Sequence, residues 1–313
     1  MLTARRATST ELAEALKLQV QRFSKQERAE RLEALHGDSQ RGDISLKDCF
    51  VVTDRRRILG VQLLVQRPDG SIIVWPAEVQ RRLSPPSEVK AIKERLYHEA
   101  RQVVDHGGGW IGQTLLERKD KQQSADLAAN GFPVLSELLF LDRPLSEPII
   151  VPSRVPQLSS ITFEDSTTHD RFAQVLEESY IGSEDCPELS HSQRTGFSAL
   201  DGHKVSGQFD PKYWRLFQHS GEDVGVLLLN EDEPDFVWEV LYFGVSSRHR
   251  GHGFGRAIVY AALKIAQAAG GQEMILAVDV RNRHALSLYE ELGFEEFDRR
   301  IAHARIRVRQ PEI

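Results

Sequence analysis

Apolar residues recur along the chain at two spacings, one typical of helices and one typical of strands. Between residues 255 and 269 they recur every three or four positions, and Gly270-Gly271 follows. This spacing predicts an amphipathic helix that ends at the glycine pair. Residues 283–292 predict a second helix, with Asn282 as its N-cap and Gly293 just past its C-terminal end.

Shorter apolar runs and turn residues divide the rest of the second half. A helix is expected over 170–179, and turns are expected at Ser220-Gly221 and at 231–235. The predicted strands cover 160–163, 213–218, 224–230, 236–245 and 274–280, followed by a closing strand that contains Ile306 and Val308.

The first half gives a similar series of elements. The predicted strands cover 50–53, 58–65, 71–75 and 110–116, and the predicted helices cover 88–104 and 122–129. Gly131-Phe132 follows the second of these helices, as Gly293-Phe294 follows the last helix of the second half. The shared order indicates an internal duplication of one α+β unit, with chance similarity of two mixed domains as the alternative.

Four prolines, at 144, 148, 152 and 156, punctuate the middle of the chain. Proline at this density suits an extended linker, because it disfavours helix at the residue before it. We therefore expect a first domain over residues 1–145, a linker over 146–157 and a second domain over 158–313.

The composition is that of a globular protein of 313 residues, 40% hydrophobic and 27% charged. No apolar run approaches the roughly 20 residues of a membrane span, and the first residues do not resemble a signal peptide. Cys49 and Cys186 form no CxxC pair, which disfavours a disulfide framework and a metal site and favours a reducing cytoplasm. The net charge of -6 argues against a nucleic-acid partner and suits a cationic substrate.

The most informative segment is the strand-to-helix connection at 245–256, which contains three alternate glycines. A turn that opens directly into a helix presents unpaired backbone N–H groups at the positive end of the helix dipole. Such a turn binds anions, and a pyrophosphate fits it. Arg248, Arg250 and Arg256 are expected to add positive charge at the same place.

Other phosphate-binding loops fit this segment less well. A Rossmann fingerprint needs G-x-G-x-x-G, whereas Gly251, Gly253 and Gly255 give G-x-G-x-G. A Walker loop needs Gly-Lys followed by Ser or Thr, which is absent here. A purely structural turn remains the alternative.

The segment from Glu239 to Phe294 resembles the core of the GCN5-related N-acetyltransferase (GNAT) superfamily. The superfamily's pyrophosphate motif and its downstream pattern are met, in order and at the expected spacing, by Arg250, Gly253, Gly255, Asn282, Ala285, Tyr289 and Gly293-Phe294. The two similar halves also resemble double-domain members of the superfamily. The resemblance implies an α+β fold of two tandem domains, each a mixed, mostly antiparallel sheet flanked by helices.

The resemblance also implies acetyl-CoA as co-substrate, bound where the strands 236–245 and 274–280 separate. Backbone groups near Phe243 and Val245 would bind the pantetheine arm and polarise the thioester carbonyl. The cofactor-binding residues implied are Phe243, Gly244, Val245, Arg250, Gly251, His252, Gly253, Phe254, Gly255, Arg256 and Asn282.

Two side chains are candidates for proton transfer. Glu239 interrupts an apolar strand, so we expect a raised pKa for its carboxyl, as suits a general base. Tyr289 lies one helical turn after Ala285 and is the candidate general acid for the departing CoA thiolate. The alternatives are a carboxylate on the solvated face of its strand and a tyrosine packed into the core.

The acceptor side is less defined. Residues 182–189 follow the first helix of the second domain, where the superfamily builds its substrate wall. Glu184, Asp185 and Glu188 could attract an amine, although an exposed acidic loop is the commoner explanation. Cys186 has no evident partner for nucleophilic catalysis.

The first half departs from the superfamily pattern. Leu127 stands in the place of Tyr289, and Asp120 in the place of Asn282. The segment 80–86 contains no glycine, and its prolines lack the N–H donors that an anion site needs. We expect this domain to have lost its pyrophosphate site and to be structural, or to help shape the acceptor pocket.

The sequence therefore predicts an N-acetyltransferase that moves an acetyl group from acetyl-CoA to a primary amine by direct attack, with a small-molecule acceptor. Two alternatives remain. One is an enzyme that acetylates a protein lysine or N-terminal amine, and the other is a non-catalytic acyl-CoA-binding module.

Overall fold

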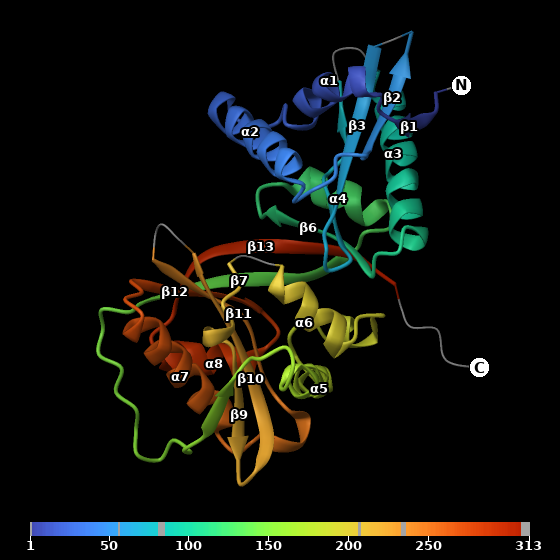
Figure 1. Cartoon of the computed structure of the whole chain (residues 1–313). Coiled ribbons are helices and arrows are strands. Elements are labelled where there is room, and N and C mark those ends of the chain that lie inside the picture. The colour runs from blue at the N-terminus through green and yellow to red at the C-terminus, as the bar shows by residue number, and fades with distance from the viewer. Residues whose placement is uncertain (1, 56, 81–84, 206–207, 233–235, 308–313) are drawn as a thin grey trace, which may run out of the picture. The chain divides into compact units, whose positions relative to one another are not determined.

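The computed structural model describes residues 2–55, 57–80, 85–205, 208–232 and 236–307. Backbone contacts divide the chain into two compact units (Figure 1). Unit 1 contains the chain up to Leu135 and the C-terminal segment from Ile301, and unit 2 contains Ser136–Arg300.

Unit 1 is a twisted sheet with helices packed on it. Its strands follow the order β1-β2-β3-β4-β6, and β5 pairs with β3. The elements, in chain order, are β1 (Ala4–Arg6), α1 (Ser9–Gln19), α2 (Lys25–Arg41), β2 (Asp48–Asp54), β3 (Arg57–Gln66), β4 (Ser71–Val74), β5 (Glu78–Val79), α3 (Pro86–His106), β6 (Ile111–Glu117) and α4 (Lys121–Ala129).

Unit 2 is also a sheet with helices packed on it. Its sheet has the order β7-β12-β11-β10-β9-β8. The elements are β7 (Val134–Pro144), β8 (Ser159–Thr162), α5 (His169–Tyr180), η1 (Pro187–His191), α6 (Gly196–Lys204), η2 (Pro211–Tyr213), β9 (Arg215–His219), β10 (Glu222–Asp232), β11 (Val237–Val245), η3 (Ser247–His249), α7 (Phe254–Ala268), β12 (Glu273–Asp279), α8 (Arg283–Glu291) and β13 (Glu295–Ile306).

Along the chain, the elements from β1 to β7 and those from β8 to β13 follow one order once β5 and the 3₁₀ helices are set aside: a strand, two helices, three strands and then helix, strand, helix, strand. Each also contains one short parallel ladder, β4–β6 in unit 1 and β11–β12 in unit 2, among antiparallel ladders such as β2–β3 and β10–β11. The predicted α+β fold class, with two similar mixed and mostly antiparallel sheets, is therefore confirmed.

The sheet of unit 2 has an apolar core on each face. One core lies under α7 and α8 and contains Trp238, Ile258 and Leu263, all fully buried. The other lies under α5 and α6 and contains Phe172 and Trp214, also fully buried. Burial of these large side chains stabilises the sheet from both sides.

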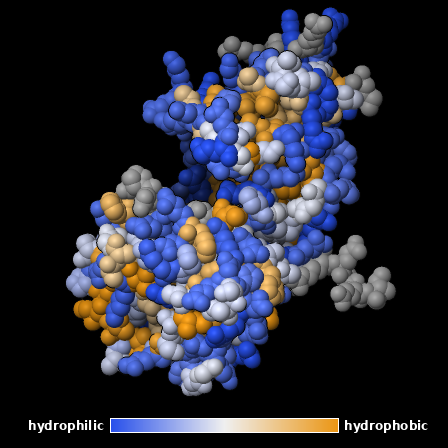
Figure 2. All heavy atoms as spheres, in the orientation of Figure 1, coloured by the Kyte–Doolittle hydropathy of each residue, from blue (hydrophilic) through white to orange (hydrophobic). Residues whose placement is uncertain are grey.

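The surface is mixed in character. Figure 2 shows hydrophobic residues at the surface where Figure 1 labels α7, within an otherwise largely hydrophilic face. No helix in the described ranges is both long and apolar enough to cross a membrane.

Several expected elements differ from those observed. Residues 134–142 were not expected to form a strand, yet β7 pairs with β12 from Pro144↔Glu273 to Leu138↔Asp279. The strand was not predicted because the prolines that follow it indicate a linker. Its buried residues alternate along the strand, as at Leu139 and Leu141. Helices α2 and α6 were also not expected.

Some expectations fall outside the part of the chain that the structure describes. They are the closing-strand residue Val308, the end of the turn at 231–235 and most of the glycine-free segment 80–86. Helix α3 begins at Pro86 with Pro85 as its N-cap, so proline does stand at the start of this helix.

Candidate functional site

The strands β11 and β12 run parallel for a short distance and then separate. Their ladder joins Val237–Glu239 to Glu273–Ile275. Past this point β11 stays paired with β10 as far as Val245, and β12 stays paired with β7 as far as Asp279. The edges of β11 and β12 that face each other therefore have backbone groups available for a ligand beyond Glu239 and Ile275.

A register shift strengthens this separation. Leu228 pairs with Tyr242 and Leu229 with Val240, so Leu241 is an extra residue in β11. A β-bulge bends its strand and increases the local twist. The bulge lies just after the last residue that pairs with β12.

The glycine turn has the geometry expected of an anion site. Gly251 and Gly253 adopt φ of 81° and 77°, a conformation that favours glycine. Gly253 is the N-cap of α7, and the first hydrogen bond of the helix runs from Ala257 N to Gly253 O at 3.3 Å. The N–H groups of Phe254, Gly255 and Arg256 precede that bond and are presented together at the positive end of the helix.

The three arginines of the turn are engaged with other groups of the protein. Arg248 pairs with Glu178, and Arg256 pairs with Glu291. Arg250 donates to the carbonyl oxygens of Ser179 and Gly182. The positive charge expected at the turn is therefore present, and each arginine is engaged with another group of the protein.

Close packing within the protein explains Gly244 but not Gly255. A Cβ at Gly244 would lie 2.5 Å from Ser179 Oγ and 2.9 Å from Tyr242 Oη. A Cβ at Gly255 would make only ordinary contacts, the nearest at 3.7 Å from Phe243. Gly244 is thus required by the fold, whereas the protein itself leaves room for a side chain at Gly255.

The remaining predicted residues of the turn pack around its ends. The rings of His252 and Phe254 stack with centroids 5.6 Å apart. Phe254 is buried in the core under α7, and Val245 packs against that core. These contacts attach the turn to the core of unit 2.

Tyr289 projects from α8 toward β11. Its ring lies edge-on to Phe243, with centroids 6.2 Å apart, and to Phe294 at 5.5 Å. The side chain is 5% exposed, and burial raises the pKa of its hydroxyl well above the ordinary value. The hydroxyl therefore keeps its proton at neutral pH, as a proton donor must.

Glu239 lies on the opposite face of β11 from fully buried Trp238 and is exposed. This exposed position agrees with the alternative of a carboxylate on the solvated face of its strand, because neighbouring residues of a strand point to opposite faces. Glu239 lies at the end of the parallel ladder, where it pairs with Ile275.

Asn282 caps α8 as predicted. Its Oδ1 accepts a hydrogen bond of 3.1 Å from Ala285 N. Burial, and then the charge of Asp279, raise the pKa of the Asp185 carboxyl, and a hydrogen bond with the Asn282 side chain partly opposes that rise. Asn282 therefore connects α8 to the loop between α5 and α6.

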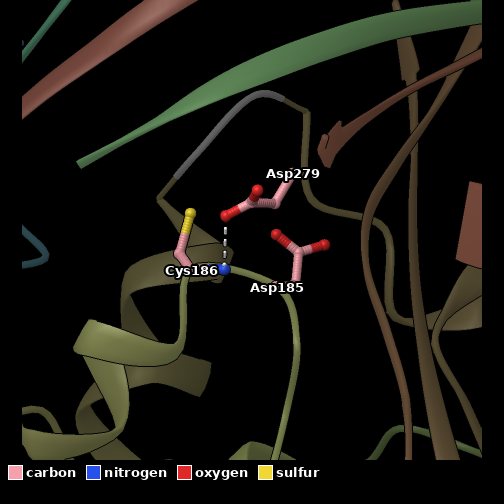
Figure 3. Close-up of side chains that lie close together, drawn as sticks. All are labelled: Asp185, Cys186 and Asp279. Atoms are coloured by element: carbon pink, nitrogen blue, oxygen red, sulfur yellow. Dashed lines mark hydrogen bonds between the residues drawn. The ribbon is translucent and has the colours of Figure 1, made fainter. Parts of the chain in front are cut away.

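That loop, residues 181–195, meets the end of β12. Cys186 N donates a hydrogen bond of 3.0 Å to Asp279 Oδ2, and Figure 3 shows the Asp185 carboxylate next to that of Asp279. The ligand atoms of Asp185, Cys186 and Asp279 lie within 4.8 Å of one another. Arg281 donates to both oxygens of Asp279, the shortest bond being 2.7 Å.

This group is a poor metal site. The guanidinium of Arg281 already compensates the charge of Asp279. Burial, and then the charges of Asp185 and Asp279, raise the pKa of the Cys186 thiol, which disfavours the thiolate that a metal needs. Asp279 and Arg281 were not predicted as site residues. The sequence feature that could have indicated them is the carboxylate of Asp279 at the end of an apolar strand.

Comparisons with known proteins agree with this geometry. Residues 176–294 match the acetyltransferase (GNAT) family model. A mycothiol acetyltransferase of Thermobispora bispora is 28% identical over 200 residues, which cover 61% of this chain and 64% of that protein, less than two thirds of its length. A mycothiol acetyltransferase of Thermomonospora curvata is 27% identical over 249 residues, which cover 77% of this chain and 76% of the relative.

One solved structure extends the likeness to the fold of the whole chain. It is a GCN5-related N-acetyltransferase from Sphaerobacter thermophilus, with a TM-score of 0.62 and 16% identity, covering 100% of this chain and 98% of that one. The match of residues 176–294 includes the glycine turn, both parallel strands and Tyr289. The site therefore lies in a segment of this chain that is similar to GNAT acetyltransferases.

Proposed function

We propose that this protein transfers an acetyl group from acetyl-CoA to a primary amine of a small molecule. The glycine turn is the observation that carries the proposal. Gly251 and Gly253 place unpaired amides at the start of α7, directly after a strand that has separated from its parallel neighbour. The family match supports acetyl transfer, and the relatives named mycothiol acetyltransferase support a small acceptor.

Each part of the site has a role in this reaction. The amides of residues 251–256 bind the pyrophosphate of acetyl-CoA, and the open edge of β11 from Phe243 to Val245 binds the pantetheine arm. A backbone N–H of that edge polarises the thioester carbonyl. Asn282 supports this region from the start of α8.

The chemical step is a direct attack. The amine nitrogen forms a C–N bond with the carbonyl carbon, and the C–S bond breaks. Tyr289 gives its proton to the sulfur as the thiolate leaves, and Glu239 accepts a proton from the nitrogen of the adduct. Cys49 and Cys186 are free thiols, and the reducing cytoplasm remains our prediction for where the reaction occurs.

Calorimetric titration of acetyl-CoA into the purified protein tests the proposal. We expect one site per chain, and we expect Gly253→Asp to abolish it. Gly270→Asp is the matched control, because Gly270 also has a left-handed φ, 89°, but lies past the other end of α7 with nothing near its side.

A panel of amines then defines the acceptor. Amino sugars, amino-acid amides, polyamines and short peptides are supplied with acetyl-CoA, and release of the CoA thiol is measured. Absence of acetyl-CoA binding overturns the proposal. Binding with turnover of peptides alone makes the acceptor a protein, and binding without turnover of any amine identifies a non-catalytic module.

A further inference from the structure

Two tyrosines meet on the face of the unit 2 sheet that lies under α5 and α6. Tyr180 is the last residue of α5, and Tyr242 lies in β11. Their rings meet edge to face, with centroids 5.6 Å apart and an interplanar angle of 78°. Both rings pack against the core that contains Phe172 and Trp214. Packing against the same core fixes the position of one ring relative to the other.

Tyr242 lies on the same face of β11 as Glu239, the group that we propose as proton acceptor. Tyr242 pairs with Leu228 of β10. Glu239 pairs with Asn230, two residues farther along the same strand. Directly paired residues share a face of the sheet, and so do residues two apart in one strand. Tyr242 therefore lies between Glu239 and the strand edge from Phe243 to Val245, which we propose for the pantetheine arm.

The hydrogen bonds of Ser179 show how the Tyr242 hydroxyl is oriented. Ser179 Oγ lies 2.6 Å from Leu176 O and 2.7 Å from Tyr242 Oη. A carbonyl oxygen only accepts, so the single proton of the serine hydroxyl goes to Leu176 O, and Tyr242 donates its own proton to Ser179. The Tyr242 oxygen lies over Gly244, 2.9 Å from where a Cβ of that residue would stand. This oxygen keeps lone pairs that can accept a hydrogen bond, but it has no proton left to donate.

The Tyr180 hydroxyl is in the opposite situation. Its oxygen is shielded from solvent, and no residue that the structure describes forms a hydrogen bond with it. A buried hydroxyl without a partner is costly, and native proteins rarely contain one. Tyr180 as a whole is only partly buried, so a bound molecule can reach this side chain. Its hydroxyl is available both to donate and to accept.

The chemistry of the two hydroxyls indicates which ligand group fits between them. Burial raises the pKa of Tyr180 and the pKa of Tyr242, so both side chains are neutral near neutral pH. The complementary group must donate to the Tyr242 oxygen and can accept from Tyr180. An ammonium only donates, and a carboxylate or an ether only accepts, whereas an alcohol hydroxyl does both from one atom.

We propose that Tyr180 and Tyr242 bind a hydroxyl group of the acceptor and thereby select primary amines that carry a hydroxyl. The acceptor hydroxyl accepts a hydrogen bond from Tyr180 and donates one to Tyr242. The inference rests on the proposed acetyl transfer and names the class of its acceptor. Because Glu239 shares this face of β11, the hydroxyl and the reacting amine lie on the two sides of the bulge at Leu241.

The unpaired state of the Tyr180 hydroxyl has a test that needs no ligand. Tyr180→Phe removes a group that has no partner in the described part of the protein, so its midpoint of urea unfolding should equal or exceed that of the wild type. Tyr242→Phe loses the hydrogen bond to Ser179 and should have a lower midpoint. A midpoint lowered as much in Tyr180→Phe as in Tyr242→Phe overturns the inference, because the Tyr180 hydroxyl would then have a partner within the folded protein.

Kinetics test the selection of the acceptor. Each hydroxylated amine of the panel is assayed beside its deoxy analogue, for example ethanolamine beside ethylamine. We expect the wild type to favour the hydroxylated member by about 10²-fold in kcat/KM, chiefly through KM. Tyr180→Phe should reduce this preference to within about threefold and keep kcat near that of the wild type.

Tyr260→Phe is the matched control. It loses the same hydroxyl from α7, whose core lies on the other face of the sheet, and it should keep the preference of the wild type. Two results overturn the inference. One is a wild type that acetylates the deoxy amines as well as the hydroxylated ones, and the other is a preference that persists in Tyr180→Phe.

A calorimetric titration measures binding without turnover. The hydroxylated amine is added to protein saturated with CoA, and we expect its affinity for Tyr180→Phe to be about tenfold or more below that for the wild type. Equal affinity for the two proteins overturns the inference. Failure of the proposed function appears separately, as loss of acetyl-CoA binding in the wild type.

Discussion

Arg250 of the glycine turn donates a hydrogen bond of 2.6 Å to the carbonyl oxygen of Ser179 near the end of α5. The same guanidinium donates to Gly182 O at 2.9 Å, so one side chain joins the glycine turn to the start of the loop between α5 and α6. We expect Arg250→Ala to increase amide hydrogen exchange in residues 181–186 by about tenfold, because local opening loses two bonds to a charged donor.

Arg256→Ala is the control for this prediction. It removes the same charge from the same turn, but Arg256 pairs with partly exposed Glu291, and such pairs contribute about 0–1 kcal/mol. Equal exchange in residues 181–186 for the two variants would show that Arg250 acts through its charge and not through its hydrogen bonds.

Gly255→Ala should weaken acetyl-CoA binding without lowering the stability of the protein. The added methyl meets only ordinary contacts within the protein, and alanine in a helix is favoured over glycine by up to about 1 kcal/mol. We expect equal or greater resistance to urea, together with acetyl-CoA affinity weakened by about tenfold or more, since the methyl stands where the pyrophosphate approaches the backbone.

Gly244→Ala provides the contrast. Its methyl would lie 2.5 Å from Ser179 Oγ, and overpacking of this kind costs about 1–3 kcal/mol. Undiminished affinity in Gly255→Ala would contradict the close approach of a ligand to this turn.

Tyr289→Phe removes the proposed proton donor and keeps the ring contacts with Phe243 and Phe294. We expect kcat to fall by about 10²-fold or more while acetyl-CoA affinity stays close to that of the wild type. Stopped-flow and steady-state rates of thiol release measure the effect. A kcat within twofold of the wild type would assign the proton to another donor.

Cys186 should not serve as an acetyl carrier. Burial, and then the charges of Asp185 and Asp279, raise the pKa of its thiol, and burial raises the pKa of Cys49 to about 12. We expect both thiols to react slowly with a maleimide in the folded protein, and Cys186→Ala to retain turnover within a few-fold. An acetylated Cys186 found by mass spectrometry during turnover would refute direct attack.

His303 should make the stability of the protein depend on pH. The ring is fully buried, with Nδ1 2.8 Å from Phe132 O and Nε2 2.8 Å from Ser124 Oγ, and desolvation lowers its pKa below 6.5. Because the unfolded chain binds a proton more readily, this contribution is complete above pH 6.5 and is lost as the pH falls through the folded pKa.

Urea unfolding at a series of pH values checks this expectation. His303→Gln should be less stable than the wild type at pH 7.5 and should show a smaller decrease of unfolding free energy on acidification. Parallel curves for the two proteins would mean that other groups determine the acid sensitivity.

The sequence was sufficient where function depends on backbone shape. Gly251 and Gly253 lie in the turn that the glycine pattern predicted before a helix, and Asn282 caps α8. It was insufficient where function depends on which side chains meet. The partners of Arg248 and Arg250 lie about 70 residues earlier in the chain, and Asp185 and Asp279 are still farther apart in the sequence. Such contacts are set by the tertiary fold, and periodicity carries no information about them.

The pairing of β7 with β12 limits how the chain can be shortened. A protein that begins at residue 158 would keep the glycine turn, both parallel strands and Tyr289, but it would lose β7 and leave the seven residues Glu273–Asp279 as an open edge. That edge belongs to the strand that carries Asp279. Unprotected edges template association with other chains, so the domain outlined by the proline-rich segment is expected to aggregate, and expression should start upstream of Val134.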